Sequence, residues 1–132
     1  MVTVDQVMNR LADFGIEAEA ADRDVVQFEL DLILNYTVNF CAFQSRDDIP
    51  ELWDERIIDR VCSEYLMKQK NAGNLEGFNY DGFIKQVKEG DTTISWGDKN
   101  NGDTPESRFD DFVNYLQRGY DKWIVRRRRL TW

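Results

Sequence analysis

Apolar residues recur at helical spacing in the first part of the chain. Val4, Val7, Met8 and Leu11 follow Thr3 at intervals of three or four residues, which indicates one buried helix face. Thr3 is a suitable N-cap, because its hydroxyl can accept a hydrogen bond from the first helical turn. Gly15 is expected to end this helix. The pattern therefore predicts a short helix over residues 3–14.

A second and longer pattern runs from Asp22 or Asp24, either of which can cap a helix, to about Cys41. Its apolar residues fall into two sets. One stripe contains Val25, Phe28, Leu32, Tyr36 and Phe40, and it is broadened by Val26, Leu30, Ile33, Leu34 and Val38. A stripe this wide is typical of a helix packed from several sides. We expect the whole of it to belong to the core and this helix to be the central one.

Two more helices are predicted after the loop at residues 43–48. Pro50 suits the first turn of a third helix, which is expected to stop near Gly73. A fourth begins at Thr104-Pro105-Glu106, where a cap precedes a proline. Its buried stripe is Phe109, Phe112, Val113 and Leu116, and Gly119 is expected to end it. A basic, aromatic tail then runs from Tyr120 to Trp132.

The stretch between the third and fourth helices is irregular and contains six of the eight glycines. Residues 81–88 can form a short helix with Phe83, Ile84 and Val87 turned inward. Thr92, Thr93, Ile94 and Trp96 form the best strand signal in the chain, because they are β-branched or aromatic. A lone strand leaves its backbone groups unpaired. This segment therefore either contacts a neighbour as an arm or folds Ile94 and Trp96 back onto the bundle.

These patterns together predict a mainly α protein. We expect a single domain over residues 1–132, a compact bundle of about four helices with a strand-like excursion near residues 92–96. Hydrophobic residues make up 42% of the chain and charged residues 32%, which is a globular composition. The N-terminus has no signal-peptide pattern, and no apolar run is long enough to span a membrane.

The residue inventory gives little support to catalysis or to a bound cofactor. The chain has no histidine, which excludes the histidine-dependent triads and zinc motifs. Residues 98–109 match a calcium-binding loop only in part, because the twelfth position is Phe109 and not glutamate. Cys41 and Cys62 form no paired motif and are expected to be reduced, buried, small apolar residues. We assign no catalytic, cofactor-binding or metal-binding residue, and we expect no enzyme.

Charge is distributed unevenly along the chain. The net charge is -8, and residues 1–50 contain ten acids but only three bases. An acidic body disfavours coating of nucleic acid, because such binding is driven largely by phosphate neutralisation. The tail differs, since it combines two tryptophans with four consecutive arginines: Trp123, Arg126, Arg127, Arg128, Arg129 and Trp132. Arginine and tryptophan are enriched in interface hot spots. The tail is therefore a candidate docking segment for an acidic partner; it could also pack on residues 1–50 or touch DNA.

Three stretches, taken in order, resemble one protein family. They are the second and third helices joined by the Phe43-to-Pro50 loop, the string from Phe83 to Trp96, and the Pro105 helix with its arginine-rich end closing on Leu130-Thr131-Trp132. From about residue 22 to the end, this order resembles the small helical head–tail connector (adaptor) proteins of long-tailed bacteriophages and prophages. The segment from Val87 to Trp96 is the most specific part of the resemblance.

The resemblance implies a structural virion protein. Such proteins dock under the portal, form a ring, extend the DNA channel and bind the next connector or tail protein. It also implies assembly in the host bacterial cytoplasm, followed by residence at the head–tail junction. Two alternatives stay open: another head-completion or tail-terminator component, and a small helical regulatory domain that binds DNA through its arginine-rich tail.

Overall fold

The computed structural model describes residues 1–16, 20–73, 79–80, 83 and 104–127. Its helices are α1 (Val4–Asp13), α2 (Arg23–Cys41), α3 (Asp54–Asn71) and α5 (Pro105–Val125), with short 3₁₀ turns at Ala20–Asp22, Arg46–Asp48 and Glu51–Trp53. The expectation of a mainly α helical bundle is confirmed. The expected strand at residues 92–96 lies outside the described residues, as does most of the expected helix at 81–88.

The starts of α1 and α5 follow from local chemistry that is visible in the sequence, whereas α3 begins at Asp54, after the 3₁₀ turn that follows Pro50. Thr3 and Gln6 form a reciprocal capping box at the start of α1. The Thr104 hydroxyl accepts a hydrogen bond from the Ser107 amide at 3.1 Å, and Pro105 occupies the first turn of α5. Beyond the C-terminal ends of α1 and α3, Gly15 and Gly73 have positive φ angles of 84° and 78°. The starts of α1 and α5 and these stops agree with the expected boundaries.

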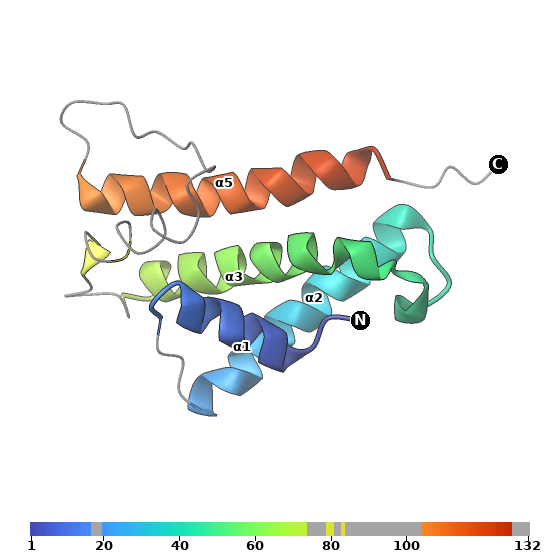
Figure 1. Ribbon diagram of the computed structural model, residues 1–132, viewed down its shortest axis with the longest axis horizontal. Coiled ribbons are helices and arrows are strands. Elements are labelled where there is room, and N and C mark those ends of the chain that lie inside the picture. Colours follow the sequence, from blue (N-terminus) through green and yellow to red (C-terminus); the bar gives the residue numbers. More distant parts are fainter. Residues whose placement is uncertain (17–19, 74–78, 81–82, 84–103, 128–132) are drawn as a thin grey trace.

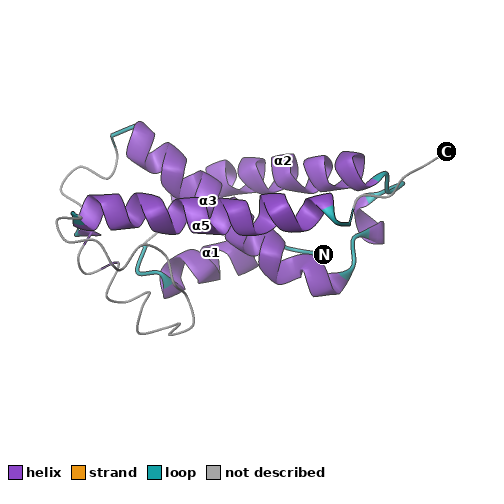
Figure 2. Ribbon diagram, turned by 90° about the horizontal axis from the view of Figure 1, so that it is seen from above, coloured by secondary structure: helices purple, strands orange, loops and turns teal. Residues whose placement is uncertain are grey.

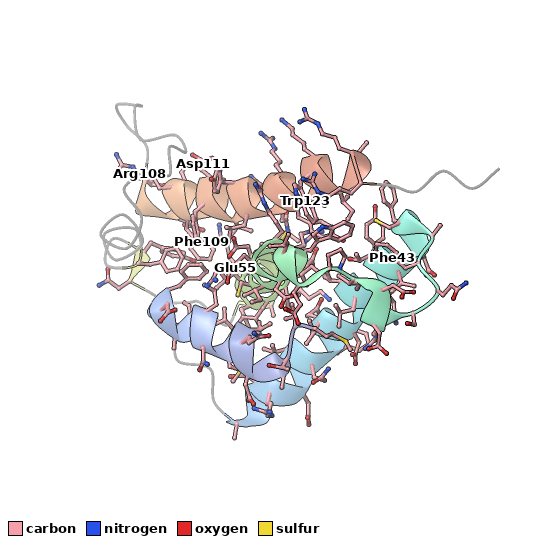
Figure 3. The ribbon with its side chains drawn as sticks, turned by 45° about the vertical axis from the view of Figure 1, so that its right-hand side comes forward. Phe43, Glu55, Arg108, Phe109, Asp111 and Trp123 are labelled. Carbon is pink, nitrogen blue, oxygen red and sulfur yellow. The ribbon has the colours of Figure 1, made fainter. Side chains whose placement is uncertain are left out.

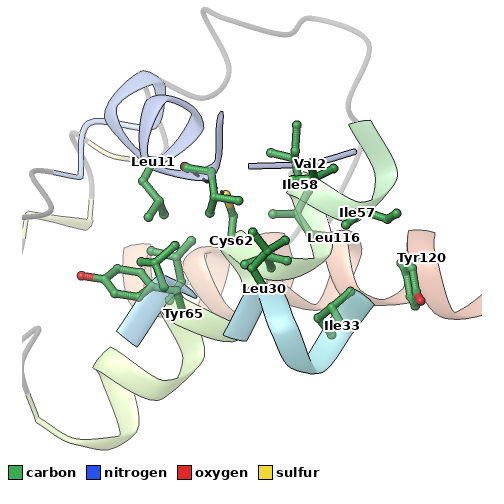
Figure 4. Packing of buried hydrophobic residues seen from close by; sticks show 14 of the residues in the cluster. Val2, Leu11, Leu30, Ile33, Ile57, Ile58, Cys62, Tyr65, Leu116 and Tyr120 are labelled. Atoms are coloured by element: carbon green, nitrogen blue, oxygen red, sulfur yellow. Dashed lines mark hydrogen bonds between the residues drawn. The ribbon is translucent and has the colours of Figure 1, made fainter. Parts of the chain in front are cut away.

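The central helix is α3, which corrects the expectation that the second helix would be central. α3 contacts each of the other three helices, and it lies between α5 and α1 in Figure 1. The reason is that α3 carries buried side chains on more than one face, among them Ile57, Cys62 and Tyr65. Figure 4 shows Leu30 and Leu116 converging on this helix from α2 and α5.

α5 is longer than expected, because it passes through Gly119 and ends at Val125. It runs antiparallel to α3 along the length of the molecule (Figure 2). Tyr120 and Ile124 continue the buried face of α5 beyond Leu116. At Gly119 the Arg56 Nη1 atom donates a hydrogen bond to the backbone carbonyl at 3.3 Å. Packing on α3 therefore keeps the α5 backbone helical at Gly119, although glycine has a low helix propensity.

Aromatic side chains fill the bundle at both ends of α5. Near its start, Phe83 is buried and lies edge-on to Phe109 and Phe112, with ring centroids 5.1 and 5.5 Å apart. This confirms the inward position expected for Phe83. Near the end of α5, the Tyr120 hydroxyl shares a buried hydrogen bond of 2.6 Å with Thr37 of α2. Each contact ties α5 to a segment distant in sequence.

Both cysteines are free and buried, as expected. Burial raises the pKa of the Cys62 thiol, and Asp59 raises it further. Cys62 is therefore a neutral thiol that packs in the core rather than a thiolate nucleophile. Within the part of the chain that the structure describes, no helix combines the length and apolar character needed to cross a membrane.

The buried tyrosines predict that stability falls at alkaline pH. Burial raises the pKa of Tyr65 and of Tyr120 from 10.0 to about 12. The unfolded chain loses these protons at lower pH than the folded chain, so the free energy of unfolding declines as pH rises from about 10 towards about 12. Tyr120→Phe is expected to lessen this decline. Urea midpoints at several alkaline pH values measure it, and equal declines in variant and wild type would contradict the prediction.

Candidate functional site

The outer face of α2 carries an apolar stripe that no other described element covers. We define the α2 stripe as Val25, Phe28, Leu32 and Tyr36, whose exposed fractions are 40%, 59%, 45% and 48%. The sequence pattern predicted these residues to be core, and this prediction was wrong. α2 instead packs through the neighbouring positions, which include Val26, Leu30, Ile33, Leu34, Thr37 and Cys41. Only one side of the wide apolar surface is therefore used by the fold.

Side chains at the edges of the α2 stripe hold it in place. The Tyr36 ring stacks on Phe40, with ring centroids 5.5 Å apart, and lies 6.4 Å from the Tyr120 ring. The Lys68 ammonium lies 5.8 Å from the centre of the Phe28 ring. Lys68 is fixed there because it also pairs with Glu29, a carboxylate that is buried in α2. The stripe is thus an ordered surface, which lowers the entropy cost of covering it.

The opposite flank of the stripe is polar. Asp24 is exposed in the first turn of α2. Asp31 pairs with Arg46 at 3.0 Å, and Arg46 also donates a hydrogen bond to Asn35 at 2.8 Å. Two of the three acids of α2 are already paired, Glu29 with Lys68 and Asp31 with Arg46. The stripe therefore offers a partner mainly its apolar surface.

A second candidate surface lies at the C-terminal end of α5. Trp123 packs edge-on against Trp53, with ring centroids 4.9 Å apart and planes at 81°. The Arg127 guanidinium stacks 4.3 Å from the centre of the Trp123 ring, and its Nη1 donates to the Trp123 carbonyl at 3.2 Å. In Figure 3, Trp123 extends from α5 towards the segment that carries Phe43. Trp123 is therefore half inside the fold, and it orders the arginine above it.

The exposed side chains around Trp123 are basic and apolar. We define the basic end of α5 as Arg118, Lys122, Val125, Arg126 and Arg127, all of which are exposed. Val125 has an exposed fraction of 62%. Arg126 and Arg127 form no ion pair with another described residue. This arrangement leaves charged groups and one branched apolar side chain available to a partner.

The site residues that were predicted from the sequence differ in where the structure places them. Trp123 packs on its own chain, whereas Arg126 and Arg127 point outward. The other seven lie outside the described residues, namely Thr92, Thr93, Ile94, Trp96, Arg128, Arg129 and Trp132. Sequence reasoning missed the α2 stripe as a surface. The feature of the sequence that could have indicated this surface is the width of the apolar pattern, which is greater than one packed helix face requires.

An ion-pair cluster joins α1 to α3 but lacks the arrangement of a catalytic or metal site. Arg10 pairs with both Glu55 and Asp59. Burial raises the pKa of Asp59, while the neighbouring Arg10 opposes that rise. Both carboxylates serve as ion-pair partners of Arg10, and the cluster ties α1 to α3. Within the described residues, no group of three or more side chains could hold a metal ion.

The α2 stripe and the basic end of α5 are thus the two candidate surfaces that the described residues present. Comparisons of the chain with protein families, with curated proteins and with solved structures found no match.

Proposed function

We propose that this protein is a structural virion component, a head–tail connector that docks under the portal, extends the DNA channel and joins head to tail. The sequence resemblance is the source of this proposal. The observation that supports it best is the α2 stripe, an apolar helix face that no other part of the described chain covers. Contiguous exposed apolar surface of this kind marks protein interaction sites.

The chemistry of the described residues supports an assembly role in preference to catalysis. The charged clusters described above include ion pairs that join helices of the bundle, Arg10 with Glu55 and Asp59, and Lys68 with Glu29. The two surfaces that the described residues leave uncovered are an apolar face and a basic, aromatic helix end. Such surfaces recognise proteins through burial and charge complementarity.

A rival proposal is a regulatory domain that binds DNA through the basic end of α5. The outward arginines beside Trp123 favour it, whereas the net charge of -8 opposes it. A mobility-shift titration at increasing salt separates the two proposals. A DNA binder loses affinity steeply as salt rises, because binding releases counterions. A connector is expected to show weak binding or none at every salt concentration.

The direct test is co-purification with the portal protein encoded in the same phage or prophage genome. We expect the isolated protein to be a monomer or weak oligomer, because its like charges oppose self-association. Mixed with portal rings, it is expected to add a second ring in negative-stain images, which portal alone must lack. If the cognate portal gains no such ring, the proposed function is wrong.

A further inference from the structure

The exposed side of α5 carries a row of side chains opposite the face that packs in the bundle. We define the outer ridge of α5 as Tyr115, Arg118, Lys122, Val125 and Arg126. At about 100° per residue, these five fall within an arc of about 100° on the helix, opposite the buried Leu116, Tyr120 and Ile124. From Tyr115 to Arg126 the ridge is about 16 Å long. Figure 3 shows side chains that end in nitrogen extending away from the bundle along this half of α5.

The cations of the outer ridge have no counterion in the described part of the chain. Arg118, Lys122 and Arg126 are exposed and belong to no ion pair between described residues. Six of the other nine described bases do pair with acids, namely Arg10, Arg23, Arg46, Arg60, Lys68 and Lys70. Of the acids of α5, Asp121 is paired with Arg60 at 3.3 Å, and Asp111 precedes the ridge by about one helical turn. Unpaired positive charge is therefore concentrated on the ridge.

Apolar side chains on the ridge indicate which kind of anion it fits. Tyr115 and Val125 have exposed fractions of 43% and 62%, and they lie on either side of Arg118 and Lys122. Duplex DNA is bound through many phosphate contacts, whereas the ridge offers three cations on a chain of net charge -8. Protein interfaces combine apolar contact with charge complementarity. The ridge therefore suits a protein segment that carries both acidic and apolar side chains.

We propose that the outer ridge of α5 binds an acidic amphipathic helix of a partner protein. The three cations recur every four residues, which is a spacing of about 6 Å along α5. Carboxylates four residues apart on a second helix have the same spacing, so a helix lying along α5 can meet each cation. Apolar residues towards its two ends contact Tyr115 and Val125. That this partner is a virion protein rests on the proposed function, whereas the binding of an acidic helix does not.

Fluorescence anisotropy tests the proposal with the full chain and a labelled synthetic peptide. The peptide has three glutamates four residues apart between two leucines, on an alanine background, and a control peptide has glutamines in place of the glutamates. At low salt we expect the acidic peptide to bind, and the control peptide to bind about tenfold more weakly because it forms none of the ion pairs. No binding of the acidic peptide, or equal binding of both peptides, would overturn the proposal.

Two charge reversals provide a matched comparison. Arg118→Glu and Arg23→Glu make the same change in net charge at exposed arginines, but Arg23 pairs with Asp5 of α1, which α3 separates from α5 in Figure 1. We expect Arg118→Glu to lower the affinity for the acidic peptide by about three- to tenfold. Arg23→Glu is expected to change it by less than about twofold, because distant exposed charges are screened. Equal losses would show that net charge alone attracts the peptide and would overturn the assignment of the ridge.

Val125→Ala and a DNA duplex distinguish a protein partner from nucleic acid. Val125→Ala is expected to lower the affinity for the acidic peptide by about two- to fivefold, because it removes apolar surface that the partner covers. A labelled duplex of about 20 base pairs is expected to bind more weakly than the peptide at the same salt concentration. Tighter binding of the duplex would show a nucleic-acid site and would overturn the proposal.

The peptide and portal experiments can fail separately. Peptide binding by a protein that adds no ring to its cognate portal would keep the acidic-helix site and would remove the head–tail function. A ring on the portal without peptide binding would have the opposite meaning.

Discussion

Leu30→Ala is expected to lower the free energy of unfolding by about 2–5 kcal/mol, the cost of removing a buried leucine from a packed core. Leu32→Ala, two positions later on the same helix, is expected to cost less than about 1 kcal/mol, because surface substitutions change stability little. The exposed fractions of 1% for Leu30 and 45% for Leu32 are the basis of this difference.

Urea unfolding followed by circular dichroism measures both variants against wild type. The pair is matched in residue type, helix and substitution, so helix propensity cancels between them. Equal losses would mean that the α2 stripe is packed in the isolated protein. In that case it could not serve as a docking face, and the proposed function would lose its main structural support.

Truncation after Lys122 is expected to cost about 4 kcal/mol or more, because it removes one fully buried side chain and one large half-buried ring. Ile124 is only 1% exposed, and Trp123 packs on Trp53. The last turn of α5 is therefore part of the core, whereas the sequence left open whether the tail that it begins docks on a partner, packs on its own chain or touches DNA.

The matched control keeps that turn and removes only its exposed charges. Arg126→Ala combined with Arg127→Ala is expected to change stability by no more than about 1 kcal/mol, since the Arg127–Trp123 stack is exposed. Thermal unfolding of the two proteins compares them. If the truncated protein is as stable as the double variant, Trp123 and Ile124 contribute nothing to the fold, and the structural role of this turn is wrong.

The two surfaces were visible in the sequence to different extents. Arg126 and Arg127 of the basic end were singled out in the sequence, because four consecutive arginines cannot all be buried, whatever the fold. The α2 stripe was not found, because the same apolar residues fit either a buried helix or a helix with one uncovered face. Hydrophobic spacing shows where side chains gather on a helix, but not which of two adjacent stripes meets a neighbour.

The starts of α1 and α5 follow from the amino-acid sequence alone. Thr3, Thr104 and Pro105 act within one helical turn, and so their effect does not depend on the rest of the fold. Gly15 and Gly73 mark the ends of α1 and α3 for the same reason, since a positive φ angle is a local property of the backbone.

How those helices share their faces depends on the tertiary fold. α3 rather than α2 became central, because it offers buried side chains to three neighbours at once. Gly119 did not end α5, because Tyr120 and Ile124 gain more by packing on the bundle than one glycine costs the helix. Which helix faces become buried depends on contacts between segments far apart in sequence, and no single segment contains those contacts.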